Sequence, residues 1–521
     1  MFLSENGING IGGLTIQQIS WVKYALAFAA ILVLLLILIL GAYKASSNHR
    51  ASRTQPLLSN GTALFAPTTI LISLDGFRAD FLHRGMSPAL SAFIEQGVSP
   101  QYMLPSFPSV TFPNHFTLVT GLYPESHGVV GNSFYDPELD EDFYYTDSSI
   151  SMQSKWWSAE PIWNTLEKQG IKSAIHMWPG SEAHIDNMDP AIVDKFNRTE
   201  ALNRKTDRIL ELLDLPDDGG DDKRPQFIAA YVPNVDSNGH KYGPNSTEVQ
   251  DTIAEVDEML GGLFAGLETR NLTNVVNVVI VSDHGMATTS TERLVQLEEL
   301  VDLDLVDRID GWPSRGLRPK HPRDLQILED QLQSAAPNYS HAVEIYSREN
   351  MPERYHFSDN DRIAPLWVIP KTGWAIVEFP ELDAQKALEE GEVYNPRGIH
   401  GYDHEHPLMR AIFLARGPSF AYPPNSRLEN FRKSFLHLSY SLSLLMKGSN
   451  WQQKIQTSTT SYATRWASNR GRITAHCGFH YSQSGCIPMR MCLSLNIPRI
   501  RYRSAARYLR LQLSALRLRH L

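Results

Sequence analysis

The sequence of 521 residues predicts an α/β protein with a doubly wound parallel sheet and helices on both faces of that sheet. Three apolar runs rich in β-branched residues lead into acidic or histidine side chains, at residues 68–74, 227–232 and 274–282. Helical segments lie between the runs, at residues 88–96, 160–169 and 248–267. Strands that lead to polar side chains and alternate with helices are typical of this fold class.

Each of the three runs is short and mostly apolar, without the regular alternation of a half-exposed strand. Runs of this kind are typical of parallel strands that are covered on both faces. The side chains that follow the runs are Asp75, Asp236, and the pair Asp283 and His284. Because ligands bind at the carboxyl ends of the strands in such sheets, we expect these side chains to belong to a site.

Two segments between the strands are less regular. Pro105, Pro108 and Pro113 frame a rigid turn that contains Thr111, and we expect a helix to begin near Asn114. A second, charged stretch at residues 300–362 has weak periodicity. We expect that stretch to form an insertion over the sheet.

The composition is that of an ordinary globular protein. Apolar residues make up 42% and charged residues 20% of the chain, which excludes a wholly disordered, collagen-like or coiled-coil protein. The mean hydropathy of −0.27 excludes a polytopic membrane protein. Three cysteines in this length exclude a scaffold built on disulfides.

The C-terminal tail differs from the rest of the chain in charge. Residues 433–521 contain no Asp or Glu but three Lys and eleven Arg, so the tail carries +14. Because the whole chain carries −9, residues 1–432 carry the difference, −23. A tail of this kind is either a basic segment that binds anionic surfaces or an artefact of gene prediction, such as a shifted reading frame. We favour the artefact, and expect a disordered tail that is dispensable beyond about residue 446.

An uncharged segment near the N-terminus predicts a membrane helix. Twenty residues without a charge lie between Lys23 and Lys44. At about 1.5 Å per residue such a helix spans about 30 Å, the thickness of the hydrocarbon core. A buried core helix and a cleaved signal peptide are the alternatives, but the length and uniformity of the segment favour an uncleaved anchor.

Five loops offer side chains suited to metal binding and catalysis. Taken singly each signal is weak, because an Asp-Gly pair is usually a turn and a hydroxyl before a helix is usually a cap. Together the loops offer three Asp, three His and one Thr: Asp75, Thr111, Asp236, His240, Asp283, His284 and His400. Nitrogen and oxygen ligands without thiolate suit two zinc or similar divalent ions.

The motifs DGFR, TFPNH, GLYPESHGVVGN, DSNGHKYGP, SDHGM and GIHGYDHEHPLMRAIFLARGP occur in this order. In combination they resemble the ectonucleotide pyrophosphatase/phosphodiesterases of the alkaline-phosphatase superfamily. The resemblance covers roughly residues 66–432 and implies an alkaline-phosphatase-like doubly wound sheet. The predicted organisation is a short cytoplasmic N-terminus at 1–23, a signal anchor at 24–43, a stalk at 44–65, a catalytic domain at 66–432 and the atypical tail at 433–521.

The resemblance also implies a role for each site residue. It implies that Thr111 is the nucleophile and that Asn132 helps to hold the phosphoryl oxygen. Phe112 and Tyr231 are implied to stack on the nucleobase. Of the two implied Zn²⁺ ions, one would be held by Asp236, His240 and His400, and the other by Asp75, Asp283, His284 and Thr111.

The resulting prediction is a membrane-anchored two-zinc phosphodiesterase and nucleotide pyrophosphatase. Through a Thr-linked intermediate it would convert small nucleotides to nucleoside 5′-monophosphates. The alternatives are a lipid or choline phosphodiesterase of the same superfamily, or a relative that binds without catalysis. We expect no nucleic-acid partner, and the sequence leaves the oligomeric state open.

The orientation in the membrane rests on opposing signals. Lysine and arginine are more frequent after the apolar segment than before it, which argues against a luminal body. Five glycosylation sequons after that segment argue for one: Asn60, Asn197, Asn245, Asn271 and Asn338. With the family resemblance, the sequons favour a single-pass type II protein. Its catalytic domain would be luminal or extracellular, at the plasma membrane or in the vacuole or endomembranes.

Overall fold

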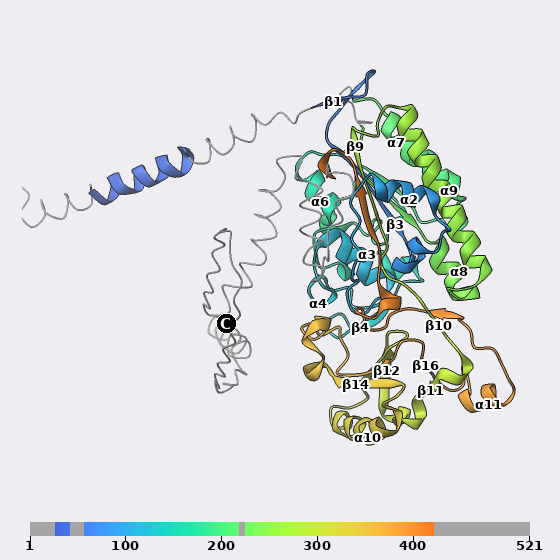
Figure 1. Cartoon of the computed structure of the whole chain (residues 1–521). Helices are drawn as coiled ribbons and strands as arrows, with labels where there is room; N and C mark the ends of the chain where they lie inside the picture. The colour runs from blue at the N-terminus through green and yellow to red at the C-terminus, as the bar shows by residue number, and fades with distance from the viewer. Residues whose placement is uncertain (1–26, 42–56, 218–223, 421–521) are drawn as a thin grey trace, which may run out of the picture. The chain divides into compact units, whose positions relative to one another are not determined.

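The computed structural model describes residues 27–41, 57–217 and 224–420 (Figure 1). Residues 27–41 are helical, and their side chains are exposed. Within the described ranges, no helix has both the length and the apolar character needed to cross a bilayer. The ends of the predicted anchor, at 24–26 and 42–43, lie outside these ranges, as does the predicted tail at 433–521.

A six-stranded sheet with strand order β18-β9-β3-β8-β6-β7 forms the centre of the fold. The strands are β3 (Thr68–Leu74), β6 (Ser173–His176), β7 (Ile192–Asp194), β8 (Phe227–Val232), β9 (Val276–Val281) and β18 (Phe413–Arg416). All neighbours are parallel except β18, which pairs with β9 in the antiparallel direction. Parallel β3 lies between β8 and β9, so the three predicted strands are neighbours at the centre of the sheet.

Helices cover both faces of this sheet, which confirms the predicted α/β architecture (Figure 1). One face carries α3 (Thr111–Thr120) and α6 (Ile162–Glu167), and the other carries α2 (Pro88–Glu95), α7 (Leu202–Asp214) and α9 (Thr247–Thr269). Successive side chains of a strand point to opposite faces. Leu71 therefore packs with the first group of helices, while Ile70 and Ile72 pack with the second. A strand covered on both sides must be apolar throughout.

Helix α3 begins at Thr111 rather than near Asn114, which corrects the predicted boundary. Pro113 lies in its first turn, where the N–H that proline lacks would have no partner inside the helix. The Asn114 side chain instead holds the preceding turn together. Its amide oxygen accepts from the Ser106 N–H at 2.7 Å, and its amide nitrogen donates to the Val110 carbonyl at 2.9 Å.

The predicted insertion forms a second sheet of its own. This sheet has the order β12-β13-β15-β14 and packs with α10 (Asp324–Tyr339). Its strands are β12 (Val306–Asp310), β13 (Arg315–Pro319), β14 (Val343–Ser347) and β15 (Leu366–Pro370). One apolar core of the insertion forms around Leu317, Leu328 and Val368. Other side chains of the insertion, among them Trp367 and Ile369, join the core that α3 and α6 form with the central sheet. Figure 1 shows the second sheet beyond the carboxyl ends of the central strands.

A buried ion pair and a hydrogen bond join the insertion to a hairpin made of β4 (Ser133–Asp136) and β5 (Glu141–Tyr144). The Asp310 carboxylate accepts from the Tyr135 N–H at 3.2 Å and from Arg318 at 2.7 Å. Arg362 donates to Asp136 at 2.6 Å. The hairpin that follows Asn132 is therefore held from both sides.

The remaining elements are short and mostly lie in the connections. They are β1 (Leu58–Ser59), β2 (Leu64–Phe65), α4 (Pro124–His127), α5 (Ser148–Ser151), α8 (Asn234–Tyr242), β10 (Ala287–Thr288), β11 (Leu294–Gln296), β16 (Ala375–Val377), α11 (Ala384–Glu389) and β17 (Gly398–Ile399). Two of them position site residues. Helix α8 follows β8 directly, and the antiparallel pair of β10 and β17 joins the segment after β9 to the segment near residue 400.

Candidate metal centre

Seven predicted site residues come from five segments of the fold. Asp75 directly follows β3, and Asp283 and His284 follow β9. Helix α8 carries Asp236 and His240 four residues apart, so both lie on one side of that helix. His400 follows β17, and Thr111 is the first residue of α3. The structure brings six of them together as two triplets: site 1, made of Asp75, Asp283 and His284, and site 2, made of Asp236, His240 and His400.

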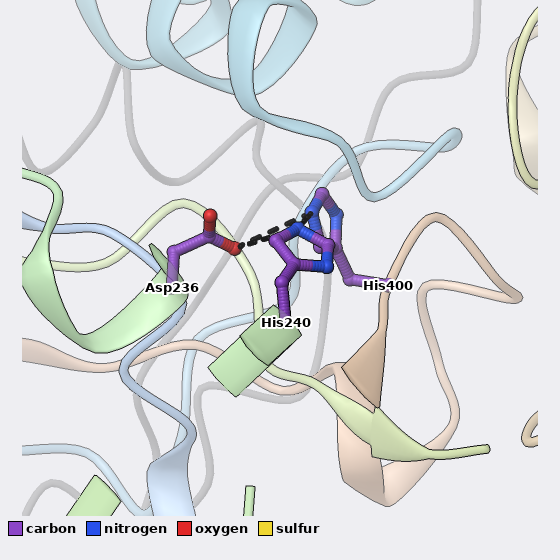
Figure 2. A group of neighbouring side chains, drawn as sticks. All are labelled: Asp236, His240 and His400. Carbon is purple, nitrogen blue, oxygen red and sulfur yellow. Dashed lines mark hydrogen bonds and ion pairs between the residues drawn. The ribbon is translucent and has the colours of Figure 1, made fainter. Parts of the chain in front are cut away.

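Site 2 brings three ligand atoms close together, although its residues are far apart in sequence. The Nε2 atoms of His240 and His400 are 3.1 Å apart. Each also lies 3.4 Å from Oδ1 of Asp236 (Figure 2). These three atoms lie close enough together to bind one metal ion.

Backbone carbonyls determine which nitrogen of each histidine faces the centre of site 2. The Nδ1 atom of His240 lies 2.8 Å from the Gly398 carbonyl, and that of His400 lies 3.0 Å from the Ser109 carbonyl. A carbonyl oxygen only accepts, so both Nδ1 atoms carry the proton. The two Nε2 atoms are then the ring atoms that face Asp236 and the centre of site 2.

Site 1 is similar in composition but more deeply buried. Nε2 of His284 lies 3.0 Å from Oδ2 of Asp283 and 3.5 Å from Oδ1 of Asp75, and the three side chains are at most 2% exposed. The His284 Nδ1 atom contacts the Gly285 carbonyl at 2.9 Å, which again leaves Nε2 as the ligand atom. The two sites adjoin, since the rings of His284 and His400 stack with centroids 3.6 Å apart.

Three carboxylate oxygens in the two sites are buried without a hydrogen-bond partner: Oδ1 of Asp75, Oδ2 of Asp283 and Oδ1 of Asp236. Each faces a histidine Nε2 of its own site. Ligands bound about 2.0–2.1 Å from a tetrahedral ion are about 3.3–3.4 Å apart. The distances between ligand atoms within each site, 3.0–3.5 Å, match that spacing. Both triplets therefore fit a divalent cation in size and in donor set.

Electrostatics inside the centre favour positive charge. Burial raises the pKa of Asp75 well above its ordinary value, and the charges of Asp283 and Asp236 raise it further. Burial also lowers the pKa of His400 well below its ordinary value, as do the other two site histidines. The protein thus keeps His400 neutral, as a metal ligand must be, and crowds three carboxylates that a cation would stabilise.

Thr111 lies beside site 1. Its Oγ1 atom is 3.3 Å from Nε2 of His284, and the residue is 8% exposed. The Asn132 amide oxygen accepts from the Phe112 N–H at 2.9 Å, which holds Asn132 at the same end of α3. The amide nitrogen of Asn132 is left to donate elsewhere. The Thr111 hydroxyl and the Asn132 amide therefore lie with both triplets near the N-terminus of α3. The N-terminus of a helix favours the binding of anions.

The two residues expected to stack on a base differ in their surroundings. The Phe112 ring lies among Phe143, Tyr145 and Trp157, with centroids 5.6–6.1 Å away. Tyr231 is 7% exposed, and its hydroxyl donates to the Asp75 carboxylate. This position does not suit the stacking role expected of Tyr231, because its ring is enclosed and its hydroxyl is engaged by a residue of site 1.

His115 and Phe196 lie near the centre but are not among the site residues predicted from the sequence. His115 lies 3.5 Å from Oδ2 of Asp283, and its position four residues after Thr111 on a helix was the available signal. The Phe196 ring is 6.1 Å from that of Tyr231 and is 50% exposed. Nothing local marks Phe196, since it follows β7 in a loop whose place depends on the sheet order.

The fold and the centre define a doubly wound α/β protein with paired carboxylate–histidine cation sites beside a threonine hydroxyl. The sequence model of the family described as type I phosphodiesterase / nucleotide pyrophosphatase matches residues 69–403. The chain therefore belongs to this family of hydrolases, as its motifs predicted.

Several known proteins are similar to this chain. A pyrophosphatase/phosphodiesterase of Schizosaccharomyces pombe, described as uncharacterized, is 43% identical over 75% of this chain and 80% of its own length. A bis(5′-adenosyl)-triphosphatase of Xenopus laevis is 36% identical over 68% of this chain and 73% of its own. Murine ectonucleotide pyrophosphatase/phosphodiesterase 5, solved as an inactive Thr-to-Ala variant with AMP, superposes with a TM-score of 0.65 at 30% identity. That match covers 73% of this chain and 95% of the murine chain.

Proposed function

We propose that this protein is a two-zinc phosphodiesterase and nucleotide pyrophosphatase that releases nucleoside 5′-monophosphates. The observation that carries the proposal is the position of the Thr111 hydroxyl, 3.3 Å from the ligand nitrogen of His284, beside two adjoining triplets. Neutral imidazole and carboxylate ligands without thiolate favour zinc over magnesium or calcium.

Site 1 together with Thr111 would hold one ion, and site 2 would hold the other. When bound, the two ions would lower the pKa of a hydroxyl or a water and offset negative charge on phosphoryl oxygens. The Thr111 oxygen attacks phosphorus, the bond to the leaving oxygen breaks, and the nucleotidyl group becomes linked to Thr111. Water then cleaves that ester, which releases the nucleoside 5′-monophosphate and restores the hydroxyl.

Asn132 and the start of α3 complete the anion site. The Asn132 amide nitrogen donates to a non-bridging phosphoryl oxygen, while its amide oxygen stays on the Phe112 N–H. A neutral donor of this kind suits a diester, which carries one charge fewer than a phosphate monoester. The amides of the first helical turn add to the stabilisation of the anion.

The relatives support a nucleotide over a lipid or choline ester. One relative is named as a bis(5′-adenosyl)-triphosphatase, and the murine structure holds AMP, which is a nucleoside 5′-monophosphate. That the murine Thr-to-Ala variant is described as inactive supports Thr111 as the nucleophile. For the base we propose a contact with Phe112, and with the half-exposed ring of Phe196 in place of Tyr231.

A substrate comparison tests the proposed function. The purified full chain should release nitrophenol from thymidine 5′-monophosphate nitrophenyl ester far faster than from nitrophenyl phosphocholine. A chelator should abolish the release, and Zn²⁺ should restore it. Preference for the phosphocholine ester would support the lipid or choline alternative, and no turnover of either ester would support a binding relative.

We further propose that residues 24–43 anchor the protein as a single-pass type II membrane protein with a luminal or extracellular catalytic domain. The uncharged apolar segment and the exposure of apolar side chains at 27–41 support the anchor. The five sequons support the placement of the domain. The plasma membrane, the vacuole and the endomembranes are all compatible with this arrangement.

A further inference from the structure

We propose that Tyr231 and His115 are positioning residues that hold the carboxylates of site 1 and raise its affinity for a divalent cation, leaving site 2 unaffected. The inference rests on the proposed metal-dependent function. It changes the role of Tyr231 from a substrate contact to a support of the metal centre. Both residues are enclosed in the fold, with His115 0% and Tyr231 7% exposed.

Tyr231 controls how Asp75 presents its two oxygens. The Tyr231 hydroxyl donates to Oδ2 of Asp75. The other oxygen, Oδ1, has no hydrogen-bond partner and lies 3.5 Å from Nε2 of His284. The phenol therefore occupies one oxygen and stops the carboxylate from rotating, so that a single oxygen is directed into site 1.

His115 links the nucleophile's backbone to the second carboxylate. Its Nδ1 atom is 2.9 Å from the Thr111 carbonyl and 3.5 Å from Oδ2 of Asp283. Since the carbonyl accepts, Nδ1 carries the proton, and Nε2 accepts from the Ser73 hydroxyl at 2.9 Å. The N–H of His115 is donated to the Thr111 carbonyl, and the edge of the ring that carries it lies against Oδ2 of Asp283, while Ser73 prevents the ring from turning over.

The two residues form one layer behind site 1. The rings of His115 and Tyr231 meet edge to face, with centroids 4.9 Å apart. On the other side of His115 lies Trp178, whose indole N–H donates to the His115 carbonyl at 3.2 Å. Closely packed rings leave little freedom for either support to move, so the carboxylates are oriented before a cation arrives.

Site 2 has no comparable support from side chains. Its histidines are oriented by the backbone carbonyls of Gly398 and Ser109. Within the described ranges, no side chain from outside the triplet hydrogen-bonds to Asp236, His240 or His400. A substitution in the layer of Tyr231 and His115 should therefore act on one ion and not on both.

Zinc titration of the metal-free full chain against a chromophoric chelator tests this inference. Wild type should bind two ions. Tyr231→Phe keeps the ring and removes the hydroxyl, so one ion should bind about 10–100-fold more weakly while the other is unchanged. The matched control is Tyr355→Phe, which removes the hydroxyl of a tyrosine that is 1% exposed and bonded to Arg354 at 3.2 Å. This control should bind both ions as wild type does.

Two variants of His115 provide a second measurement. In His115→Asn the amide nitrogen takes the place of Nδ1 and can still donate toward the Thr111 carbonyl and Asp283. In His115→Ala that donor is lost. The Asn variant should retain more of the site 1 affinity than the Ala variant, whereas a purely structural role of the ring would weaken both alike. Thermal unfolding of the metal-free variants shows whether each is folded.

The outcomes separate the inference from the function on which it rests. A wild-type chain that binds fewer than two ions overturns the two-metal proposal and this inference with it. Two ions in wild type, with Tyr231→Phe unchanged or with both ions weakened equally, overturn the positioning role alone. Loss of affinity at one ion only, with the Tyr355→Phe control unaffected, supports it.

Discussion

The Nε2 atoms of His240 and His400 lie 3.1 Å apart, and both face the Asp236 carboxylate. Each ring contacts a backbone carbonyl through Nδ1, at Gly398 and at Ser109. The two histidines are 160 positions apart in the sequence, so only the fold brings their Nε2 atoms together. Two imidazole nitrogens and a carboxylate oxygen this close to one another can bind one divalent cation.

Removal of metal should destabilise the protein. A cation that binds only the folded state, at 1,000 times its Kd, adds about 4 kcal/mol to the free energy of unfolding. We therefore expect a chelator to lower Tm, and readdition of Zn²⁺ to restore it. Thermal unfolding followed by circular dichroism would measure this. An identical Tm with and without chelator, in a chain freed of metal beforehand, would contradict the proposed centre.

Replacement of Thr111 by Ala should remove diester cleavage and leave the fold intact. The side chain is small, and its hydroxyl contacts His284 without capping the helix. We expect a loss of at least about 1,000-fold in kcat, about 4 kcal/mol of barrier. Zinc content and circular dichroism serve as controls for folding. Activity within about tenfold of wild type, or about 1.4 kcal/mol, would show that Thr111 is not the nucleophile.

Truncation of Phe196 should weaken nucleotide recognition. Stacking of a base on an aromatic ring contributes about 1–3 kcal/mol, which corresponds to a loss of about 5–150-fold in kcat/KM for Phe196→Ala. Phe379→Ala is a matched control, because Phe379 is 52% and Phe196 50% exposed. Steady-state rates on thymidine 5′-monophosphate nitrophenyl ester would measure both. Equal losses in the two variants would argue against a base contact at Phe196.

Acid should destabilise the protein partly through Asp194. Burial raises the pKa of this carboxyl, but hydrogen bonds from His176 and Arg208 outweigh it and lower the pKa to about 2. The folded state therefore binds this proton less readily than the unfolded chain, whose Asp has a pKa of about 3.9. The stabilisation is present above about pH 4 and is lost as the pH falls toward 2.

Asp194→Asn should therefore weaken the dependence of the free energy of unfolding on pH. In metal-free protein, the free energy of unfolding of wild type should fall more steeply between about pH 5 and 2 than that of the variant. Asp207→Asn, at an exposed position of α7 beside Arg208, is the control and should follow wild type. Urea titrations at several pH values would measure the slopes. If the free energy of unfolding fell with pH at the same rate in wild type and in Asp194→Asn, Asp194 would not contribute to the loss of stability in acid.

Glycosidase treatment tests the placement of the catalytic domain. A glycan attaches to the amide nitrogen of asparagine, which in Asn60 donates to the Arg270 carbonyl at 2.9 Å. Asn197 is exposed, and its amide oxygen, but not its nitrogen, is engaged by Thr199. We expect Asn197→Gln to remove one glycan and Asn60→Gln to change little. Electrophoretic mobility that glycosidase leaves unchanged would contradict a luminal or extracellular domain.

Local sequence predicted the central elements closely. Strands β3 and β8 have the bounds that their apolar runs indicated, at Thr68–Leu74 and Phe227–Val232. A strand that is buried on both faces is apolar at nearly every position, so its bounds can be predicted from the local sequence alone. The start of α3 was placed three residues late, because a proline in the first turn of a helix looks the same in sequence as a proline in a loop.

The sequence by itself determined the family and the ligand types, because motif order and residue chemistry do not depend on coordinates. Only the tertiary structure decided how those ligands are supported. It directed the Tyr231 hydroxyl to Asp75, placed His115 against Asp283, and paired His240 with a histidine 160 positions away. It also gave the insertion a core and a sheet of its own. These relationships depend on packing between segments that are far apart in the sequence. A local sequence pattern therefore does not predict them.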